Sequence, residues 1–479
     1  MNENTPISEI NQLVVQAQEA FLAFKRTSIK QRTEFMHLVA DEIEAVGPEL
    51  IATAQSETNL PEARLIGEKA RTVFQWRSYA DAIGNVLDVR IDTADAARTP
   101  PKPDIRKTSV GLGVVVVFGA SNFPFAFSTA GGDTASAIAA GCPVIVKTHP
   151  GHPETSALMA GAINKAIRKA GLPVGLFAEV RSDTFEGGQY LVSHPLVKAV
   201  GFTGSFAGGK ALHDLAAQRS EPIPVFAEMG SVNPVFLLPG KLESSAVAVA
   251  KQYAASLTLG VGQFCTNPGI LVVPNHGSLP SFLDTLQTHI AETAAAPMLH
   301  AGITSAYGKS KAALLSHEGV EVLVDGNATV ATVSASRFLA NDQLAHEVFG
   351  PFGLVVTYDT QEEAVAIAET LQGQLTATVL AEPEDIGNHQ QLIGWLSDKC
   401  GRLLLNGFPT GVEVCYAMQH GGPYPATTDS RFTSVGPDAI KRFVRPLSYQ
   451  SWPDEFLPDE LKDANPLGIW RTVNGELRR

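Results

Sequence analysis

Cysteine is scarce in this sequence, and long apolar runs are missing. The four cysteines do not form a CxxC motif and have no histidines near them at metal-ligand spacing, so no metal site is expected. The first ten residues carry neither a cluster of positive charge nor an apolar segment, so no signal peptide is expected. No stretch approaches about 18 consecutive apolar residues, which argues against a membrane span. These absences favour the reducing cytoplasm.

Positive charge is also in deficit. Lysine and arginine total 36 against 49 aspartates and glutamates, which gives a net charge of −13. Because proteins that bind nucleic acid usually present a basic surface, we expect no nucleic-acid partner. A local basic pocket for one cofactor phosphate remains compatible with this charge. Hydrophobic residues make up 44% of the chain, as in globular proteins with large cores.

The N-terminal part of the chain has helical periodicity. Apolar residues recur at helical spacing over 10–24, and Ser28 with Gln31 forms a capping-box sequence for a second helix. A proline-rich stretch at 99–103 then marks a boundary. Strands and helices alternate after it, with a helix expected over 125–140. This alternation predicts a parallel, doubly wound sheet, and a second alternation after Glu228 predicts a second α/β domain.

Cys265 lies in a glycine-rich loop, GVGQFCT at 260–266. Glycine lets the backbone approach a ligand closely and leaves N–H groups free. A thiolate is the best side-chain nucleophile near neutral pH, so Cys265 is a candidate nucleophile. The alternative is a buried structural cysteine, because free cysteine is among the most buried residue types.

Two polar residues follow apolar strands. Glu228, before Met229 and Gly230, is a candidate general base, because burial would desolvate its carboxylate. An ion-paired or helix-capping glutamate is the alternative. Asn122 lies at the strand end where open α/β sheets bind ligands, and its amide is a candidate donor to an oxyanion. A turn asparagine is the alternative there.

Three further segments contain candidate functional residues. GFTGS at 201–205 joins a strand to a helix start, where free N–H groups and the helix dipole favour a pyrophosphate, although it is not a GxGxxG motif. Lys147 ends a strand and is placed to bind a ribose. Glu347 lies in HEVFGP at 346–351. The alternatives are an ordinary strand-end lysine and a loop carboxylate.

Together these segments resemble the aldehyde dehydrogenase superfamily in order and spacing over nearly the full length. The matching residues are Asn122-Phe123-Pro124, Lys147, Phe202-Thr203-Gly204-Ser205, Glu228-Met229-Gly230, Asn233-Pro234, Gly262-Gln263-Phe264-Cys265 and Glu347-Val348-Phe349-Gly350-Pro351. GQFCTNPG at 262–269 and NPLGIWR at 465–471 are most similar to the branch of 2-oxoglutarate semialdehyde dehydrogenases and bacterial NADP-dependent fatty aldehyde dehydrogenases.

The resemblance implies the catalytic roles. Cys265 attacks the aldehyde carbon, and the Asn122 amide and the Cys265 N–H hold the oxyanion. Hydride transfer to NADP or NAD leaves a thioester, which water activated by Glu228 hydrolyses. The cofactor contacts implied or suggested are Lys147, Thr148, His149, Arg181, Phe202, Gly204, Ser205, Glu347 and Phe349, with Lys147 at the adenosine ribose and Glu347 at the nicotinamide ribose.

The resemblance also implies an α/β fold in three parts: a Rossmann-like cofactor domain, an α/β catalytic domain and a small β bridging element. The expected division is 1–97 with 113–227 for the dinucleotide-binding domain, 228–440 for the catalytic domain, and 98–112 with 441–479 for the bridging element. A homodimer or homotetramer follows from it.

Two departures from the family pattern affect specificity. Many members have a glutamate that binds the adenosine ribose at the position of Pro150, so the loss of this carboxylate predicts that NADP is tolerated. Thr148, His149 and Arg181 are candidate contacts for its phosphate. The usual late glycine-rich segment is replaced by HGGPYP at 420–425, expected near the substrate entrance.

Phe123, Phe264 and Arg431 are candidate substrate contacts. A semialdehyde acid such as 2,5-dioxopentanoate needs a cation for its far carboxylate, and Arg431 is a candidate, with a surface arginine as the alternative. A medium- or long-chain fatty aldehyde needs an apolar tunnel, for which the phenylalanines at 118–127 are candidates unless they are core. The branch resemblance favours 2,5-dioxopentanoate. Alternatives of another class are a cofactor-independent thioester hydrolase and a non-catalytic relative.

Overall fold

The first lobe is built on a parallel sheet of short apolar strands. The computed structural model describes residues 4–479. The strands lie in the order β5-β4-β3-β6-β7, all parallel. Their bounds are β3 (Val114–Phe118), β4 (Val144–Lys147), β5 (Phe177–Val180), β6 (Val197–Thr203) and β7 (Val225–Glu228). The strand order reverses direction between β3 and β6, where such sheets bind ligands, and the doubly wound sheet is confirmed.

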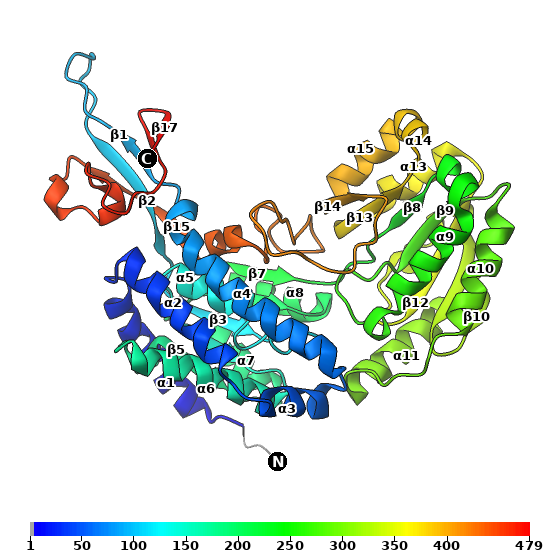
Figure 1. The fold of residues 1–479 in the computed structure, drawn as a ribbon, viewed down its shortest axis with the longest axis horizontal. Helices are drawn as coiled ribbons and strands as arrows, with labels where there is room; N and C mark the ends of the chain where they lie inside the picture. Colours follow the sequence, from blue (N-terminus) through cyan, green and yellow to red (C-terminus); the bar gives the residue numbers. More distant parts are fainter. Residues whose placement is uncertain (1–3) are drawn as a thin grey trace.

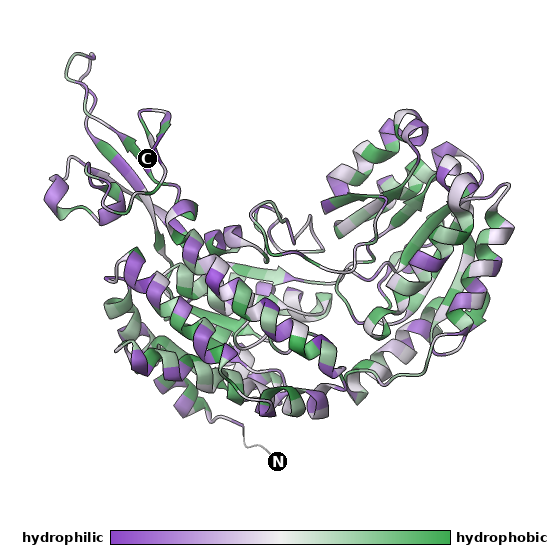
Figure 2. Cartoon of the chain, viewed as in Figure 1, coloured by the Kyte–Doolittle hydropathy of each residue, from purple (hydrophilic) through white to green (hydrophobic). Residues whose placement is uncertain are grey.

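Helices surround this sheet (Figure 1). They are α1 (Ile7–Phe24), α2 (Ile29–Glu44), α3 (Glu49–Thr58), α4 (Glu62–Val86), α5 (Gly132–Ala139), α6 (Pro153–Lys169), α7 (Phe185–Ser193) and α8 (Phe206–Ala217). The capping box at Ser28 and Gln31 is confirmed, because each side chain bonds the other residue's backbone N–H. Figure 2 shows hydrophobic strands inside and helices with mixed hydrophilic and hydrophobic residues around them.

The second lobe contains a seven-stranded sheet in the order β10-β11-β12-β9-β8-β13-β14, in which only the β10–β11 pair is antiparallel. Its strands are β8 (Val235–Leu237), β9 (Ile270–Pro274), β10 (Glu321–Asp325), β11 (Thr329–Ser334), β12 (Phe352–Tyr358), β13 (Gln374–Leu380) and β14 (Cys400–Leu405). Its helices are α9 (Pro239–Thr258), α10 (Leu279–Ala291), α11 (Ala301–Leu315), α12 (Ala335–Leu339), α13 (Gln361–Thr370), α14 (Pro383–Asn388) and α15 (Gln390–Lys399). The second α/β unit is therefore present.

A small third sheet projects from the first lobe (Figure 1). Its order is β15-β2-β1-β16-β17, with β1 (Arg90–Asp92), β2 (Ile105–Gly111), β15 (Val444–Gln450), β16 (Arg471–Val473) and β17 (Glu476–Arg478). The boundary expected at residue 98 is wrong, because β1 already belongs to this sheet. Its Arg90 and Ile91 pair with β16 on one side and with β2 on the other.

The catalytic division expected to run to residue 440 is also wrong at its end. After β14 the chain leaves the second lobe and returns to the first, and we call residues 407–443 the return segment (Figure 1). It ends in the 3-10 helix η4 (Pro437–Phe443), which packs against α4 and α5. Ile440 and Phe443 are fully buried in the core of the first lobe, and this burial explains the return.

The helix expected over 125–140 begins only at Gly132. The preceding residues form a loop, because the N–H groups of Phe125 and Ala126 donate to the Glu68 carboxylate on α4 at 2.8 and 3.0 Å instead of to helix carbonyls. Trp76 of the same helix donates its indole N–H to the Ala130 carbonyl at 2.7 Å. Helix α4 therefore holds the loop that contains Asn122.

Among residues 4–479, no helix has both the length and the apolar character that a membrane span needs.

Replacing Glu68 with leucine removes the acceptor of two buried N–H groups. We expect Glu68→Leu to destabilise the first lobe by about 2–4 kcal/mol, since each unpaired buried donor costs about 1–3 kcal/mol. The loss is measured as a lower midpoint of a thermal melt followed by tryptophan fluorescence. Glu68→Gln keeps a carbonyl acceptor and is the matched control. Equal midpoints for the two variants would contradict this role of Glu68.

Candidate active site

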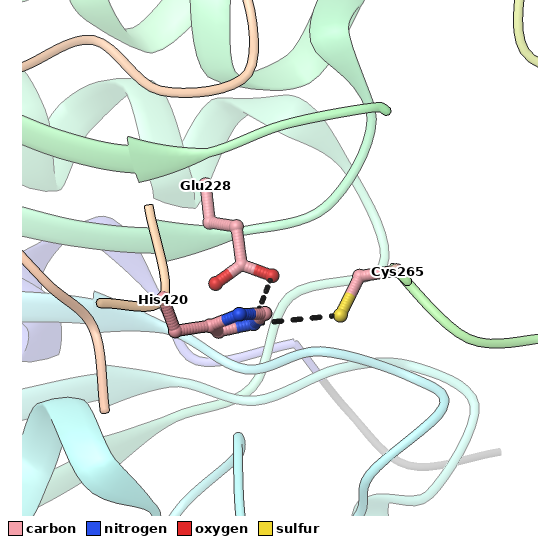
Figure 3. A group of neighbouring side chains, drawn as sticks. All are labelled: Glu228, Cys265 and His420. Carbon is pink, nitrogen blue, oxygen red and sulfur yellow. Dashed lines mark hydrogen bonds and ion pairs between the residues drawn. The ribbon is translucent and has the colours of Figure 1, made fainter. Parts of the chain in front are cut away.

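Cys265, Glu228 and His420 come from three distant parts of the chain and meet at one point (Figure 3). Glu228 ends β7, Cys265 follows the short 3-10 helix η2 (Leu259–Gly262) after α9, and His420 lies in the return segment. His420 Nε2 lies 3.5 Å from Cys265 Sγ and 3.1 Å from Glu228 Oε1. One imidazole nitrogen thus contacts both the thiol and the carboxylate.

The surroundings hold the carboxylate and the imidazole in place. Both side chains are almost fully buried. Glu228 Oε2 accepts a hydrogen bond from the Ser434 hydroxyl at 2.8 Å. The His420 backbone N–H donates to Thr433 Oγ1 at 2.9 Å, and its ring packs edge-on against Phe127. Ser434 and Thr433 both belong to the return segment, which is anchored in the core of the first lobe. The imidazole is therefore fixed relative to β7.

Charge and burial determine the protonation states of the Cys265 thiol and the Glu228 carboxylate. Burial raises the pKa of the Cys265 thiol well above its ordinary value, and the negative charges of Glu228 and Glu347 raise it further. Burial alone would also raise the pKa of Glu228, but His420 and the hydrogen bond from Ser434 outweigh it, so that pKa is lowered. The site at rest therefore holds a neutral thiol beside an ionised carboxylate, and the thiol needs a base to become a nucleophile.

Asn122 lies against the loop of Cys265, as an oxyanion donor requires. Its side-chain Nδ2 donates to the Gln263 carbonyl at 3.1 Å, and its own carbonyl accepts from Arg64 Nη2 at 2.6 Å. The Arg64 guanidinium lies over the rings of Phe123 and Phe264, at 4.7 and 5.0 Å from their centroids. The structure thus brings Asn122 and both predicted substrate phenylalanines together beside the thiol.

The pyrophosphate candidates lie one strand from Glu228. Ser205 caps α8 by accepting from the Gly208 N–H, and both Gly204 and Ser205 are exposed at the N-terminus of this 12-residue helix. The Gly204 N–H donates to the Glu228 carbonyl at 3.0 Å, which ties the helix start to the catalytic strand. The open end of α8 suits a diphosphate, because the first N–H groups of a helix attract anions.

Glu347 and Phe349 lie near the loop that carries Cys265. They line a cavity together with Gly262 of the Cys265 loop. A Cβ on Gly230 would lie 2.5 Å from Glu347 Oε2, so this carboxylate packs directly on the backbone after Glu228. Burial raises the pKa of Glu347 to about 7. A buried carboxylate at a cavity edge suits ribose hydroxyls, which donate hydrogen bonds.

The residues predicted to bind the adenosine end of the cofactor differ in whether their side chains already have partners within the protein. Lys147 ends β4, and burial lowers its pKa against the opposing charge of Asp183. The side chains of the other predicted contacts are engaged within the protein. The Thr148 hydroxyl donates to Val180, His149 stacks on His152, Arg181 pairs with Glu154 and Glu179, and Phe202 packs on Phe118.

The structure does not bring Arg431 to the site. Its side chain is 79% exposed, and its guanidinium is held by Asp429 two residues earlier. It is therefore the surface arginine of the alternative interpretation.

Sequence reasoning also missed His420 as a functional residue. Its one signal was the replacement of the usual glycine-rich segment by HGGPYP, which marked the place without giving the role.

A doubly wound sheet with an open helix N-terminus at its edge, in a chain that also brings together a thiol and a buried carboxylate, is typical of a nucleotide-dependent enzyme. Comparison with known proteins identifies the family. The model of the aldehyde dehydrogenase family matches residues 4–424, and the chain belongs to that family. Its relatives use NAD or NADP, and its reaction is the oxidation of an aldehyde.

Two curated relatives are similar over almost the full length. Alpha-ketoglutaric semialdehyde dehydrogenase 2 of Azospirillum brasilense is 48% identical over 96% of this chain and 90% of its own. Alpha-ketoglutaric semialdehyde dehydrogenase of Acinetobacter baylyi is 44% identical over 98% and 92%. Among solved structures, an NAD-dependent aldehyde dehydrogenase from Sinorhizobium meliloti matches with a TM-score of 0.76 at 23% identity, over 93% of this chain and 87% of that chain, which shows the shared fold.

The pKa of Cys265 gives a direct test of this electrostatic arrangement. The charged form of the thiol is the anion, so a neighbouring carboxylate opposes its ionisation. Glu228→Gln removes that negative charge, and we expect the pH midpoint of Cys265 alkylation by iodoacetamide to move to lower pH. Peptide mass spectrometry separates Cys265 from the exposed Cys415. Glu347→Gln is the matched comparison and should shift the midpoint less in the same direction. A midpoint in Glu228→Gln that is unchanged or higher would contradict the arrangement.

Proposed function

We propose that this protein oxidises 2,5-dioxopentanoate to 2-oxoglutarate with NADP or NAD, through a thioester on Cys265. The observation that carries the chemistry is the contact of His420 Nε2 with both Cys265 and Glu228, next to the amide of Asn122. The substrate is supported by the names of the two relatives at 48% and 44% identity, which act on alpha-ketoglutaric semialdehyde, another name for 2,5-dioxopentanoate.

The first step is attack by the thiol. As Cys265 Sγ bonds to the aldehyde carbon, its proton passes through His420 Nε2 toward Glu228. The carbonyl oxygen becomes an oxyanion that accepts hydrogen bonds from Asn122 Nδ2 and the Cys265 N–H. Loss of one such donor typically raises the barrier by about 2.7–4 kcal/mol. The oxyanion then collapses to the carbonyl of the thioester as the same carbon loses hydride, and oxidised nicotinamide, when bound, would supply the acceptor for that hydride.

The second step is hydrolysis of the thioester. Once Glu228 has released to solvent the proton that it took up in the first step, it takes a proton from water, the hydroxide attacks the acyl carbon, and the thiolate leaves and recovers that proton from Glu228. Because the pKa of Glu228 is held low, the carboxylate is in its basic form at neutral pH. His420 limits its freedom to move, so we infer that the imidazole positions the carboxylate in this step and transfers the proton in the first.

The cofactor is proposed to bind along the carboxyl edge of the first sheet. Lys147 binds the adenosine ribose, Gly204 and Ser205 bind the pyrophosphate, and Glu347 binds the nicotinamide ribose. NADP is proposed to be accepted, because Pro150 supplies no carboxylate against the extra phosphate. Arg181 is a predicted contact for that phosphate, and it would exchange its carboxylate partners Glu154 and Glu179 for it.

We propose that the small sheet mediates assembly into a homodimer or homotetramer. Both end strands of this sheet carry free backbone edges, and so does β14 of the second lobe, whose Leu403 and Leu405 are exposed. Open apolar strand edges favour pairing with a second chain.

The four cysteines are unpaired, in accord with a cytoplasmic location.

An initial-rate comparison tests the proposed substrate. Wild-type protein is offered 2,5-dioxopentanoate, succinate semialdehyde and a long-chain aldehyde with NAD and with NADP. We expect the highest kcat/KM for 2,5-dioxopentanoate, no turnover by Cys265→Ser, and wild-type turnover by the matched control Cys415→Ser. Preference for the long-chain aldehyde would instead favour a fatty aldehyde dehydrogenase. Thioester hydrolysis without reduced cofactor would favour a hydrolase.

The role of His420 has its own test. We expect His420→Gln to lower kcat by about 100- to 10,000-fold, as for loss of a general acid–base group, with little change in the cofactor Kd. The rate of Cys265 alkylation at neutral pH should fall as well, because the proton acceptor of the thiol is gone. A variant with wild-type kcat and alkylation rate would show that the imidazole only fills space.

A further inference from the structure

Two arginines from opposite lobes bind the same short stretch of the return segment. Arg71 on α4 donates from Nη2 to the Val412 carbonyl at 3.4 Å. Arg402 on β14 donates from Nη2 to the Pro409 carbonyl at 2.8 Å and from Nη1 to the Gly411 carbonyl at 3.1 Å. Both guanidinium groups therefore lie on the part of the chain that leads to His420.

Contacts also connect Arg71 to the reacting thiol. Its guanidinium carbon lies 5.2 Å from the ring centroid of Phe127, and that ring packs edge-on against His420, which contacts Cys265 Sγ. Burial lowers the pKa of both Arg71 and Arg402, and the ionised form of Cys265 would act on each pKa in the opposite direction. The two cations thus share the electrostatic surroundings of the nucleophile.

Neither arginine has a carboxylate partner within ion-pair distance among residues 4–479. The Arg402 Nε is moreover buried without a hydrogen-bond partner in that part of the chain. Within the same part of the chain, Arg71 makes two long hydrogen bonds, both at 3.4 Å, to Gln75 and Val412, which leaves three of its five donors without a hydrogen bond there. Arg431, in contrast, is exposed and paired with Asp429. Partly buried guanidinium groups without a direct ion-pair partner favour an anionic ligand.

We propose that Arg71 and Arg402 bind the carboxylate of the substrate at the end opposite its aldehyde. This inference rests on the proposed function, since it explains how the same site selects a semialdehyde acid. In 2,5-dioxopentanoate three carbons separate the aldehyde carbon from the carboxylate. With the aldehyde at Cys265, the short chain passes the rings of Phe127 and His420 and its carboxylate reaches the guanidinium groups. Long apolar aldehydes would leave both cations buried and unpaired.

The test compares acidic and neutral aldehydes of similar length. The variants are Arg71→Gln, Arg402→Gln and, as the matched control, Arg431→Gln, assayed with 2,5-dioxopentanoate, succinate semialdehyde and pentanal. We expect each of the first two to lower kcat/KM for the acids on the order of 10- to 100-fold, mainly through KM, since a hydrogen bond to a charged group is worth about 1.5–3 kcal/mol. The loss of kcat/KM for pentanal should be smaller than the loss for the acids, because a neutral aldehyde forms no ion pair with either arginine. Arg71→Lys should recover part of the preference for acids, because it restores charge without the planar fork.

Failure of this inference and failure of the proposed substrate give different results. If the wild type prefers 2,5-dioxopentanoate and both glutamine variants keep that preference, the substrate stands and the arginines are not its ligands. If the wild type does not prefer acids, the proposed substrate fails. Protection of Cys265 from iodoacetamide by 2-oxoglutarate then decides about the arginines. Protection that is absent in the wild type, or kept in Arg71→Gln and Arg402→Gln, would overturn carboxylate binding.

Discussion

The contact of one histidine nitrogen with a thiol and a carboxylate is the interaction on which the rest of this structure depends. It requires the chain to leave the second lobe after β14 and return to the first, since neither lobe alone supplies all three groups. The return is stabilised by the burial of η4 against α4 and α5, and by bonds from the return segment to β7, such as that of Ser434 to Glu228. The chemistry of the site is thus coupled to the packing between the two lobes.

Helix α4 plays a comparable role for the other half of the site. One face of this helix presents Arg64 to the Asn122 carbonyl, Glu68 to two N–H groups of the following loop, and Arg71 to the return segment. A helix that sequence reasoning assigned only to the cofactor domain therefore positions Asn122, the proposed oxyanion donor, and supplies a candidate substrate ligand. Because its contacts with the loop are buried and charged, small changes here are expected to move Asn122.

Much of the fold was predictable because it follows from local pattern. β-branched runs gave the strands, Ser28 and Gln31 gave a helix start, and the alternation of elements gave the doubly wound sheet. Cys265, Glu228 and Asn122 were predictable from motifs in the right order. The place of β1 and the return of 407–443 were not, because both are decided by pairing and burial between residues far apart in the sequence. Arg431 failed for a local reason, since Asp429 satisfies it, and His420 gains its role only through contacts from three separate segments.

The central claim is that Cys265 carries an acyl group that Glu228 helps to remove. Intact-protein mass spectrometry of Glu228→Gln, mixed with oxidised cofactor and 2,5-dioxopentanoate and quenched in acid, tests it most directly. The account predicts one equivalent of reduced cofactor and an added mass equal to the acyl group, located on the peptide that contains Cys265. Formation of reduced cofactor with no added mass, or an adduct on another residue, would contradict it.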